Sequence, residues 1–405
     1  MKVMRNEYEE YRKNLLNDIT HKSYPKIGKI KIENFEFMDL NVKYISEEKV
    51  TSLPENIKCK IDDDNNIVVL KDGNIIFNNL NSHFNDIKIK TYYDALETND
   101  DTVLNAFRKQ FKINEDNKLV NINKVFQNSF LYIEVPKNVV IDDELKLYII
   151  GEKSDLVHYT LIVCNESSEF TLVEKIDSIK PIKVNYVSEV QIKDNAKLTY
   201  IGIDRLMGKT STFIERKGIV YDDGKLIYAL GQLNDSYTVS NNLIKLVGKN
   251  SYCESRSVLF TDKENIHAIT VNVEHLSPYS YGRIINHGIV KDKGYLFVDG
   301  IGKIHQGMNN SNSQQNTNVI TLSDDARVIV NPYLLIDEFD VQAGHGAGIG
   351  KVDEEQLYYL MSRGLSKVEA EKLIIIGFLY PIIEMISSDK IKTSFIKTIE
   401  NKLLI

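Results

Sequence analysis

The chain has 405 residues, of which 42% are hydrophobic and 26% charged, a composition typical of a globular protein rather than a disordered or collagen-like one. Its 57 acidic and 50 basic residues give a formal net charge of -7 without the basic stripe that would follow a phosphate backbone, which argues against a nucleic-acid partner. Cys59, Cys164 and Cys253 form no C-x-x-C pair, which argues against a disulfide framework or a structural zinc site and predicts reduced thiols in a cytoplasmic protein.

No segment of the sequence has the pattern of an export signal or a membrane span. Acidic residues follow directly after residues 1–5, where a signal peptide would need an apolar stretch. The longest apolar run, residues 373–386, contains Pro381 and Glu384 and is shorter than the ~18 residues that a helix needs to cross a bilayer. We therefore expect no membrane partner and a cytoplasmic location.

The first 115 residues combine helical and strand-like patterns. Apolar residues recur at three- and four-residue spacing within residues 1–24, which predicts an amphipathic helix. Short alternating strands separated by polar turns are expected over residues 27–85, and a second helical stretch over residues 92–111. We therefore predict a small N-terminal α+β domain over residues 1–115.

A turn-and-strand pattern recurs in residues 116–350. Asp194 to Leu198 and Asp222 to Leu226 have the same form and lie 28 residues apart. The form returns at Asp292 and Asp324, and the 70 residues between Asp222 and Asp292 are two and a half periods. A repeated turn and strand of this length is what a β-solenoid shows, because its single strands must stack to bury their inner faces. An antiparallel sandwich with a chance similarity among its turns is the alternative.

Residues 351–405 have the pattern of a helical domain. Asp353 and Ser366 are each followed three residues later by Gln or Glu, which is the pattern of a capping box, and Gly364 between them suits a helix end. These signals predict helices over residues 353–363, 366–387 and 390–404.

The second of these helices is apolar nearly all round between Leu373 and Ile383. An element near the end of a chain rarely buries every face in its own domain, so part of this surface could belong to a partner. Burial among the three C-terminal helices is the alternative.

The segment Gly344 to Gly350 contains four glycines and one histidine. A Walker loop would need glycine at 345 and Ser or Thr in place of Val352, and the dinucleotide pattern G-x-G-x-x-G fails at Ile349. His345 is left with little side-chain cover, just downstream of acidic residues at 337–340, where it could approach a metal or a partner. The alternative is that the glycines make a sharp turn from strand to helix, which His345 caps.

The other histidines show no H-E-x-x-H or comparable spacing, so we expect them to be surface or packed side chains. Cys164 and Cys253 lie in apolar, strand-like surroundings and are expected to be buried and inert. No G-x-S-x-G motif points to a hydrolase. The histidines in question are His21, His83, His158, His267, His275, His287 and His305.

The amide-rich stretch Asn309 to Asn318 predicts a loop at its start and a strand from Gln315 onward. A ladder of amides stacked across solenoid rungs is a second interpretation.

Several motifs in a fixed order resemble the SufB/SufD family of iron–sulfur cluster assembly proteins. Together they span about residues 120–386, which makes the resemblance specific, whereas the first 115 residues match loosely. The motifs are His275, Ser277-Pro278, Gln315 to Ser323, Asn331 to Ile336, His345-Gly346-Ala347, Asp353 to Leu360, Ser362-Arg363-Gly364 and Gly377-Phe378.

The resemblance implies a right-handed parallel β-helix core between the N-terminal α+β domain and the C-terminal helices. It also implies a non-enzymatic scaffold that pairs through its β-helix with a SufB-like paralogue and binds a SufC-like ABC ATPase through its C-terminal helices. A transient iron–sulfur cluster would form at the subunit interface. The resemblance implies that this chain itself binds no nucleotide. It does not indicate whether a flavin binds. The partner-binding residues that it implies are Leu357, Leu360, Arg363, Leu373, Ile376 and Phe378.

Two positions favour the SufD branch of this family. The SufB branch has a cysteine in the segment that matches residues 315–318, and this chain has none there. The SufD branch has a histidine that matches His345, so the resemblance makes His345 the candidate metal ligand for the cluster. Many members of that branch have a cysteine two residues earlier, where this chain has Ala343.

Other functions stay open at this point. One is a self-pairing SufB-like cluster scaffold, against which the missing cysteine counts, and a homodimer in isolation is a related alternative. Another is a carbohydrate-active β-helix enzyme, since one fold can serve several functions. That enzyme would need carboxylates with Arg or Lys along one solenoid face, and a secretion signal.

Overall fold

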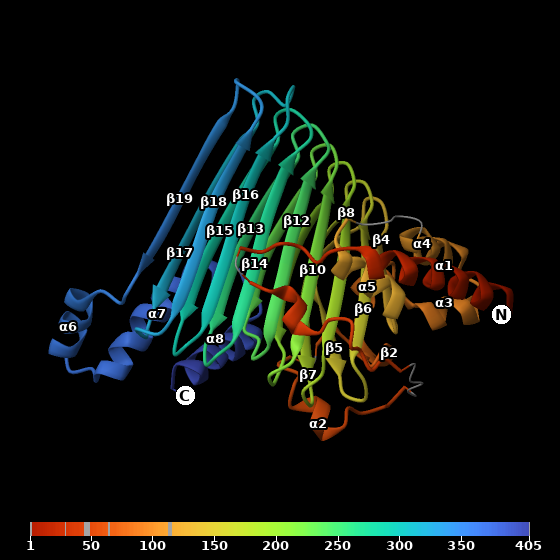
Figure 1. Ribbon diagram of the computed structural model, residues 1–405. Helices are drawn as coiled ribbons and strands as arrows, with labels where there is room; N and C mark the ends of the chain where they lie inside the picture. The colour runs from red at the N-terminus through yellow and green to blue at the C-terminus, as the bar shows by residue number, and fades with distance from the viewer. Residues whose placement is uncertain (1, 29, 44–48, 64, 112–115, 405) are drawn as a thin grey trace.

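The computed structural model describes residues 2–28, 30–43, 49–63, 65–111 and 116–404. At its centre, strands alternate between two sheets and form one long stack (Figure 1). The strands of this stack are β4 (Ser129–Val135), β5 (Val140–Gly151), β6 (Leu156–Cys164), β7 (Glu169–Ser178), β8 (Val184–Ile192), β9 (Lys197–Arg205), β10 (Ser211–Val220), β11 (Lys225–Gln232), β12 (Tyr237–Leu246), β13 (Tyr252–Thr261), β14 (Ile266–His275), β15 (Tyr281–Val290), β16 (Tyr295–Ile304), β17 (Asn312–Thr321), β18 (Arg327–Ile336) and β19 (Gln342–Gly350).

Each of these strands pairs in parallel with the strand two places along the chain. The odd-numbered strands of the stack build most of a 10-stranded sheet, and the even-numbered strands build most of a 9-stranded sheet. One rung therefore consists of one strand from each sheet. This is a parallel β-solenoid of about 8 turns, which confirms the predicted fold class and excludes the antiparallel sandwich.

The sequence repeat corresponds to one rung of the solenoid. Lys197 lies in register with Lys225, and the turns before these strands hold Asn195 and Asp223 in the left-handed backbone region, with φ of 57° and 55°. Short polar residues adopt that region more readily than bulky ones. Asp292 lies in the turn between β15 and β16, at the opposite edge of the stack. The half period in the repeat is therefore the step from one sheet to the other.

Side chains alternate along each strand, so every second residue points into the space between the two sheets. This space is filled by one continuous apolar cluster in which residues such as Leu198, Leu226 and Leu246 are fully buried. Burial of this kind is the main source of the solenoid's stability, because the stacked strands cover one another's inner faces.

The N-terminal region extends both sheets instead of forming a sheet of its own. The hairpin of β1 (Ile67–Lys71) and β2 (Asn74–Asn79) continues the 10-stranded sheet, and β3 (Lys88–Thr91) pairs antiparallel with β4 in the other sheet. Two short helices, η1 (Ile32–Phe35) and α2 (Glu55–Lys58), precede β1, and η2 (Ser82–Phe84) lies between β2 and β3. Much of the segment predicted as strands is thus irregular or short helix.

The N-terminal helices cover the outer face of the 9-stranded sheet. They are α1 (Lys2–His21), α3 (Tyr92–Thr98), α4 (Asp101–Phe111) and α5 (Lys118–Phe126). The helix predicted over residues 92–111 is broken into α3 and α4, because Asn99 ends α3 in the left-handed region, with φ of 50°. The predicted domain boundary after residue 115 lies outside the described residues.

The C-terminal helices are α6 (Glu354–Ser362), α7 (Lys367–Ile383) and α8 (Asp389–Leu404), close to the predicted ranges. Of these, α7 and α8 cover the opposite side of the solenoid. Asp353 caps α6 by accepting from the Gln356 N–H at 2.8 Å, and Ser366 and Glu369 form the predicted capping box of α7. Among the described residues, no helix combines the length and the apolar character that a membrane crossing requires.

Gly248, in the turn between β12 and β13, is a position where stacked turns leave no room for a side chain. A Cβ atom there would lie 2.0 Å from the backbone nitrogen of Asp222 in the rung below. We predict that Gly248→Ala lowers the free energy of unfolding by about 1–3 kcal/mol, because the two turns must separate. Denaturant unfolding measures this loss. Gly350→Ala is the control, since nothing lies within 4 Å of its added atom, and equal losses in both variants would contradict the prediction.

Candidate functional site

The C-terminal end of the solenoid is open. Its last rung consists of β18 and β19, and each of these strands has a neighbour on one side only within the described chain. In Figure 1 no strand lies beyond β19 at this end of the stack. The inner side chains of β19 are exposed, Ile349 to 53%, whereas those of β18 are partly buried. Edge strands of this kind are templates for pairing with another chain.

His345 lies on the interior side of β19 at this open end. It is in register with Gln315 of β17, which is in register with Ile284 of β15. Gln315 and Ile284 are 6% and 2% exposed, whereas His345 is exposed. The imidazole therefore faces the space that a further rung would fill.

The glycines around His345 form the outer side of the same strand. A Cβ atom on Gly344 would lie 2.6 Å from the Gln314 amide oxygen, and one on Gly348 would lie 2.7 Å from the Asn318 amide oxygen. Glycine is required because these amide side chains of β17 lie across the backbone of β19. The segment is thus a strand, and the alternative that it is a sharp turn capped by His345 is wrong.

The amide-rich stretch is mainly strand. β17 begins at Asn312, three residues before the predicted start at Gln315. The Asn312 amide group donates to the Gln342 amide oxygen in the next rung at 3.0 Å. One pair of the suggested amide ladder is therefore present, and it ties β19 to the strand below it.

The carboxylates upstream of His345 are not assembled around it. The Glu338 carboxylate accepts hydrogen bonds from the backbone N–H groups of Phe339 and Gly307, at 2.8 and 2.7 Å. These bonds orient it toward its own turn and hold its pKa below the usual value. Within the described ranges, no group of three or more His, Cys, Asp or Glu residues could hold a metal ion. A metal at His345 would therefore need further ligands from another molecule.

Most other histidines are packed inside the chain, as expected. Burial lowers the pKa of His158 to about 3 and the pKa values of His267 and His275 to about 4, so these rings are neutral at physiological pH. Cys164 and Cys253 are fully buried thiols, and burial raises the pKa of Cys253 to about 12. None of these groups is placed to react with a solute.

A second uncovered surface lies on α6 and the start of α7, which together we call the hairpin. α6 contains no buried residue, Arg363 is exposed, and Leu357 and Leu360 are partly exposed. Exposed apolar patches of this kind mark interaction sites. The large apolar side chains of the patch are Tyr358 (76% exposed), Tyr359 (56%), Met361 (42%), Val368 (56%) and Leu373 (54%).

The second half of α7 packs on the 10-stranded sheet. Phe378 stacks on His287 of β15, with ring centroids 4.4 Å apart, and its carbonyl oxygen is 2.6 Å from Nδ1 of that histidine. Ile376 also packs against this face. The second half of the helix therefore packs on the solenoid and on α8, so burial among the three C-terminal helices alone is wrong. Leu373, in the first half, is 54% exposed, and its contact with a partner stays a prediction. Of the six candidate partner-binding residues, Ile376 and Phe378 are used largely within the chain.

α8 is fixed at both ends by charged and polar contacts. At its C-terminal end, Nζ of Lys402 lies 2.5 Å from the carboxylate of Asp235 and 3.2 Å from that of Asp262. These two aspartates lie in the turns after β11 and β13. At its N-terminal end, Lys390 is 3.2 Å from Asp63, a residue of the N-terminal region. Phe395 lies between these ends, so close to Gly231 that a Cβ atom there would clash at 2.3 Å. α8 therefore anchors the helical domain, and α6 projects beyond the strands (Figure 1).

We predict that Lys402→Met lowers the free energy of unfolding at neutral pH by about 1–3 kcal/mol, because the buried Asp262 loses its salt bridge and Asp235 keeps only Lys263. Burial alone would raise the pKa of Asp235, but Lys402 and Lys263 hold it below its usual value. The Lys402–Asp235 ion pair therefore stabilises the folded chain at neutral pH, and this contribution is lost as the pH falls through the pKa of Asp235. The difference in stability between the Lys402 variant and the wild type should therefore shrink on acidification.

Thermal unfolding of both proteins over a pH series measures this effect. The control is Lys209→Met, which removes an exposed pair with Glu264 and should change stability little. A pH-independent loss in the Lys402 variant would contradict the electrostatic explanation.

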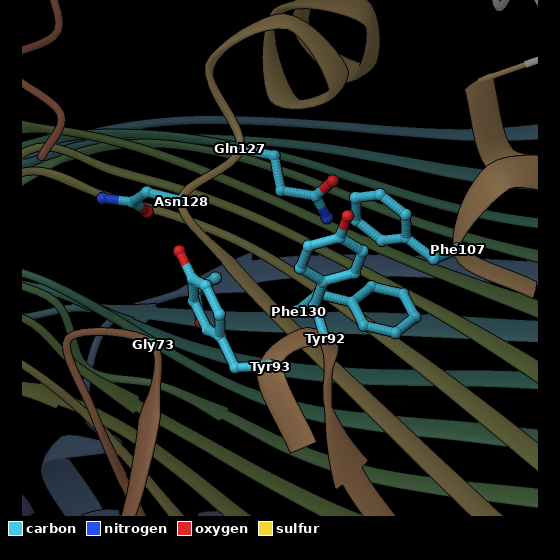
Figure 2. Close-up of a pocket in the computed structure, with 8 residues that line it drawn as sticks. Gly73, Tyr92, Tyr93, Phe107, Gln127, Asn128 and Phe130 are labelled. Atoms are coloured by element: carbon cyan, nitrogen blue, oxygen red, sulfur yellow. The ribbon is translucent and has the colours of Figure 1, made fainter. Parts of the chain in front are cut away.

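A small pocket lies far from His345, where β4 begins. Figure 2 shows aromatic rings from α3, α4 and β4 around it, with two amide side chains beside them. Its volume of about 50 Å³ suits water rather than a cofactor. It is lined by Gly73, Tyr92, Tyr93, Phe107, Gln127, Asn128, Ser129 and Phe130.

The fold and its two uncovered surfaces define a parallel β-solenoid protein with helical additions from both ends of the chain. Residues 148–378 match the family model for the SUF system FeS cluster assembly, SufBD core domain. The iron–sulfur cluster assembly protein SufD of Bacillus subtilis is 34% identical over 393 residues, which cover 94% of this chain and 90% of that protein. An iron–sulfur cluster assembly SufBD family protein of Staphylococcus saprophyticus is 25% identical over 318 residues, which cover 76% of this chain and 68% of that protein.

The chain therefore belongs to the SufB/SufD family of iron–sulfur cluster assembly proteins, and within it to the SufD branch. This confirms the resemblance seen in the ordered motifs of the sequence. The role of His345 and of the six helix residues stays a prediction.

Proposed function

We propose that this chain is the SufD-type scaffold subunit of a SufBCD complex, located in the cytoplasm, which assembles iron–sulfur clusters without catalysing a reaction by itself. Its open end would pair with a SufB-like paralogue, and its hairpin would bind a SufC-like ATPase. The cluster is the cargo of this complex and not a resident cofactor. The observation that carries the proposal is an exposed imidazole on the inner side of an unpaired terminal rung.

The open end supports pairing with another solenoid. A partner with the same two-sheet cross-section would supply strands for both unpaired edges and would cover the inner side chains of the last rung. His345 would then lie inside the joint, where a metal ion could take an imidazole from one subunit and its other ligands from the next. A homodimer would satisfy the same edges but would contribute only a second imidazole and no cysteine from the segment 315–318.

The hairpin supports an ATPase as the second partner. Its exposed apolar residues project from a firmly anchored base, so a nucleotide-driven movement of the bound ATPase would act on the solenoid rather than on a loose tail. The open end and the hairpin lie on the same side of the molecule, as Figure 1 shows.

We predict that His345→Ala leaves the complex intact but reduces iron and sulfide bound per complex by about tenfold, because one ligand of the cluster is removed. The measurement is metal and acid-labile sulfide analysis of the complex purified after co-expression with its SufB-like and SufC-like partners. His83→Ala, which removes another exposed imidazole far from the open end, is the control. Full cluster loading of the His345 variant would refute the ligand assignment.

For the hairpin, we predict that Leu373→Asp weakens ATPase binding by at least about tenfold, since it places a charge in the apolar patch. Pairing with the SufB-like subunit should be unchanged. Titration calorimetry or co-purification checks both. Val140→Asp is the matched control, because Val140 is also apolar and exposed (61%) but lies far from the hairpin. If both variants bind the ATPase equally well, the hairpin is not its binding surface.

A further inference from the structure

A row of buried polar side chains runs through the interior of the solenoid. It begins at Ser129, which lines the pocket in Figure 2 and whose hydroxyl lies 2.6 Å from Nδ1 of His158. Nε2 of the same ring lies 2.6 Å from the hydroxyl of Thr160. Thr160 and Ser188 are register neighbours on the inner side of the 9-stranded sheet, and so are Ser188 and Arg216.

The middle of the row is a charged cluster. The Arg216 guanidinium is fully buried and donates to Asp204 at 2.6 Å. Glu174 lies 3.8 Å from the same guanidinium and accepts from Tyr186 at 2.6 Å and from Tyr200 at 2.5 Å. Burial raises the pKa of Glu174, so this group resists ionisation despite its cationic neighbour.

Further polar side chains lie toward the open end, but Val271 follows Asn242 in register and Ile284 separates Ser255 from Gln315. Asn242 is the register neighbour of Arg216, and Ser257 is the register neighbour of Asn286. The Asn286 amide donates to Thr317 at 3.1 Å, and the Gln315 amide donates to the Tyr333 carbonyl at 2.7 Å. Gln315 lies directly beneath His345.

Many atoms of this row have no hydrogen-bond partner among the described residues, although the side chains that carry them are at least nine-tenths buried. Both polar atoms of the Asn242 amide are among them, in the middle of the solenoid. The complete set is Ser188 Oγ, Arg216 Nε, Tyr228 Oη, Asn242 Oδ1 and Nδ2, Ser255 Oγ, Ser257 Oγ, Asn286 Oδ1 and Gln315 Oε1.

Unpartnered polar atoms in a dry interior are costly, and the summed cost over this row would be comparable to the whole net stability of a folded chain. Buried polar groups in stable proteins are instead bonded to protein or to internal water. Several of these atoms lie on register neighbours: Ser188, Arg216 and Asn242 follow one another in the 9-stranded sheet, and Ser257 lies next to Asn286 in the other sheet. Small side chains such as Ser188, Ser255 and Ser257 take up little of the space between the sheets at these positions.

We propose that the solenoid binds a file of ordered water molecules, interrupted at Ile284, at the unpartnered atoms of this row from Ser188 to Gln315. This bound water does not depend on the proposed pairing with a partner.

Substitutions in the row test for the bound water, because the melting temperature should fall if water is bound and stay or rise if it is not. Ser257→Ala and Asn242→Leu remove unpartnered polar atoms while changing side-chain volume little. If these atoms bond to water, each substitution leaves a water without its partner, and the melting temperature of the isolated chain should fall. If the row is dry, each substitution removes an unsatisfied group, and an unchanged or raised melting temperature would overturn the proposal. Ser280→Ala calibrates the expected fall, because that hydroxyl lies 2.8 Å from His275 and 3.0 Å from Ser311.

A crystal structure of the unpaired chain, at a resolution that shows ordered water, is the direct test. We expect water within hydrogen-bond distance of Asn242, Ser257 and Gln315, and its absence there would overturn the proposal. Both measurements use the chain without partners, so failure of the file and failure of His345 as a cluster ligand are separate outcomes.

Discussion

The constraint on which the whole molecule depends is the in-register stacking of parallel rungs. Every strand in the middle of the stack is held by backbone hydrogen bonds to the rung before it and the rung after it. That pairing places equivalent residues in columns, so one position in the sequence repeat sets what lies inside, outside or at a turn along the full length. It also means that the last rung cannot satisfy its own outer edge, which leaves β18 and β19 open.

The two outer faces of the solenoid are covered by different parts of the chain. Apolar residues of the N-terminal helices pack on the 9-stranded sheet, and α7 and α8 pack on the 10-stranded sheet. Each sheet is therefore covered on part of its outer face as well as on its inner face, as parallel sheets generally are. The end of the stack and the hairpin lie outside this cover, and their exposure is what makes them candidate binding surfaces.

The elements that could be predicted from the sequence are those that local chemistry determines. The elements that could not be predicted depend on pairing between distant parts of the chain. Polar turns recur at a fixed period and helix caps act over four residues, so the solenoid and the C-terminal helices could be read directly. The joining of β1 and β3 to the solenoid sheets could not be predicted, because it depends on partners 40 or more residues away. α5 was missed since its capping residue, Asn117, leads into an alternating pattern that resembles a strand. The glycines around His345 were open to a turn interpretation until the amides of β17 were seen lying across them.

The arrangement of α7 explains how the two uncovered surfaces can act together. Phe378 is held to His287 of β15 by ring stacking and by a hydrogen bond to its carbonyl oxygen. β15 pairs with β17, and β17 pairs with β19, which carries His345. Two strand spacings, about 10 Å of hydrogen-bonded sheet, therefore separate the base of the hairpin from the open end. In the proposed complex, a displacement of the hairpin would be transmitted through these stiff strands, because α8 is anchored and cannot yield in its place.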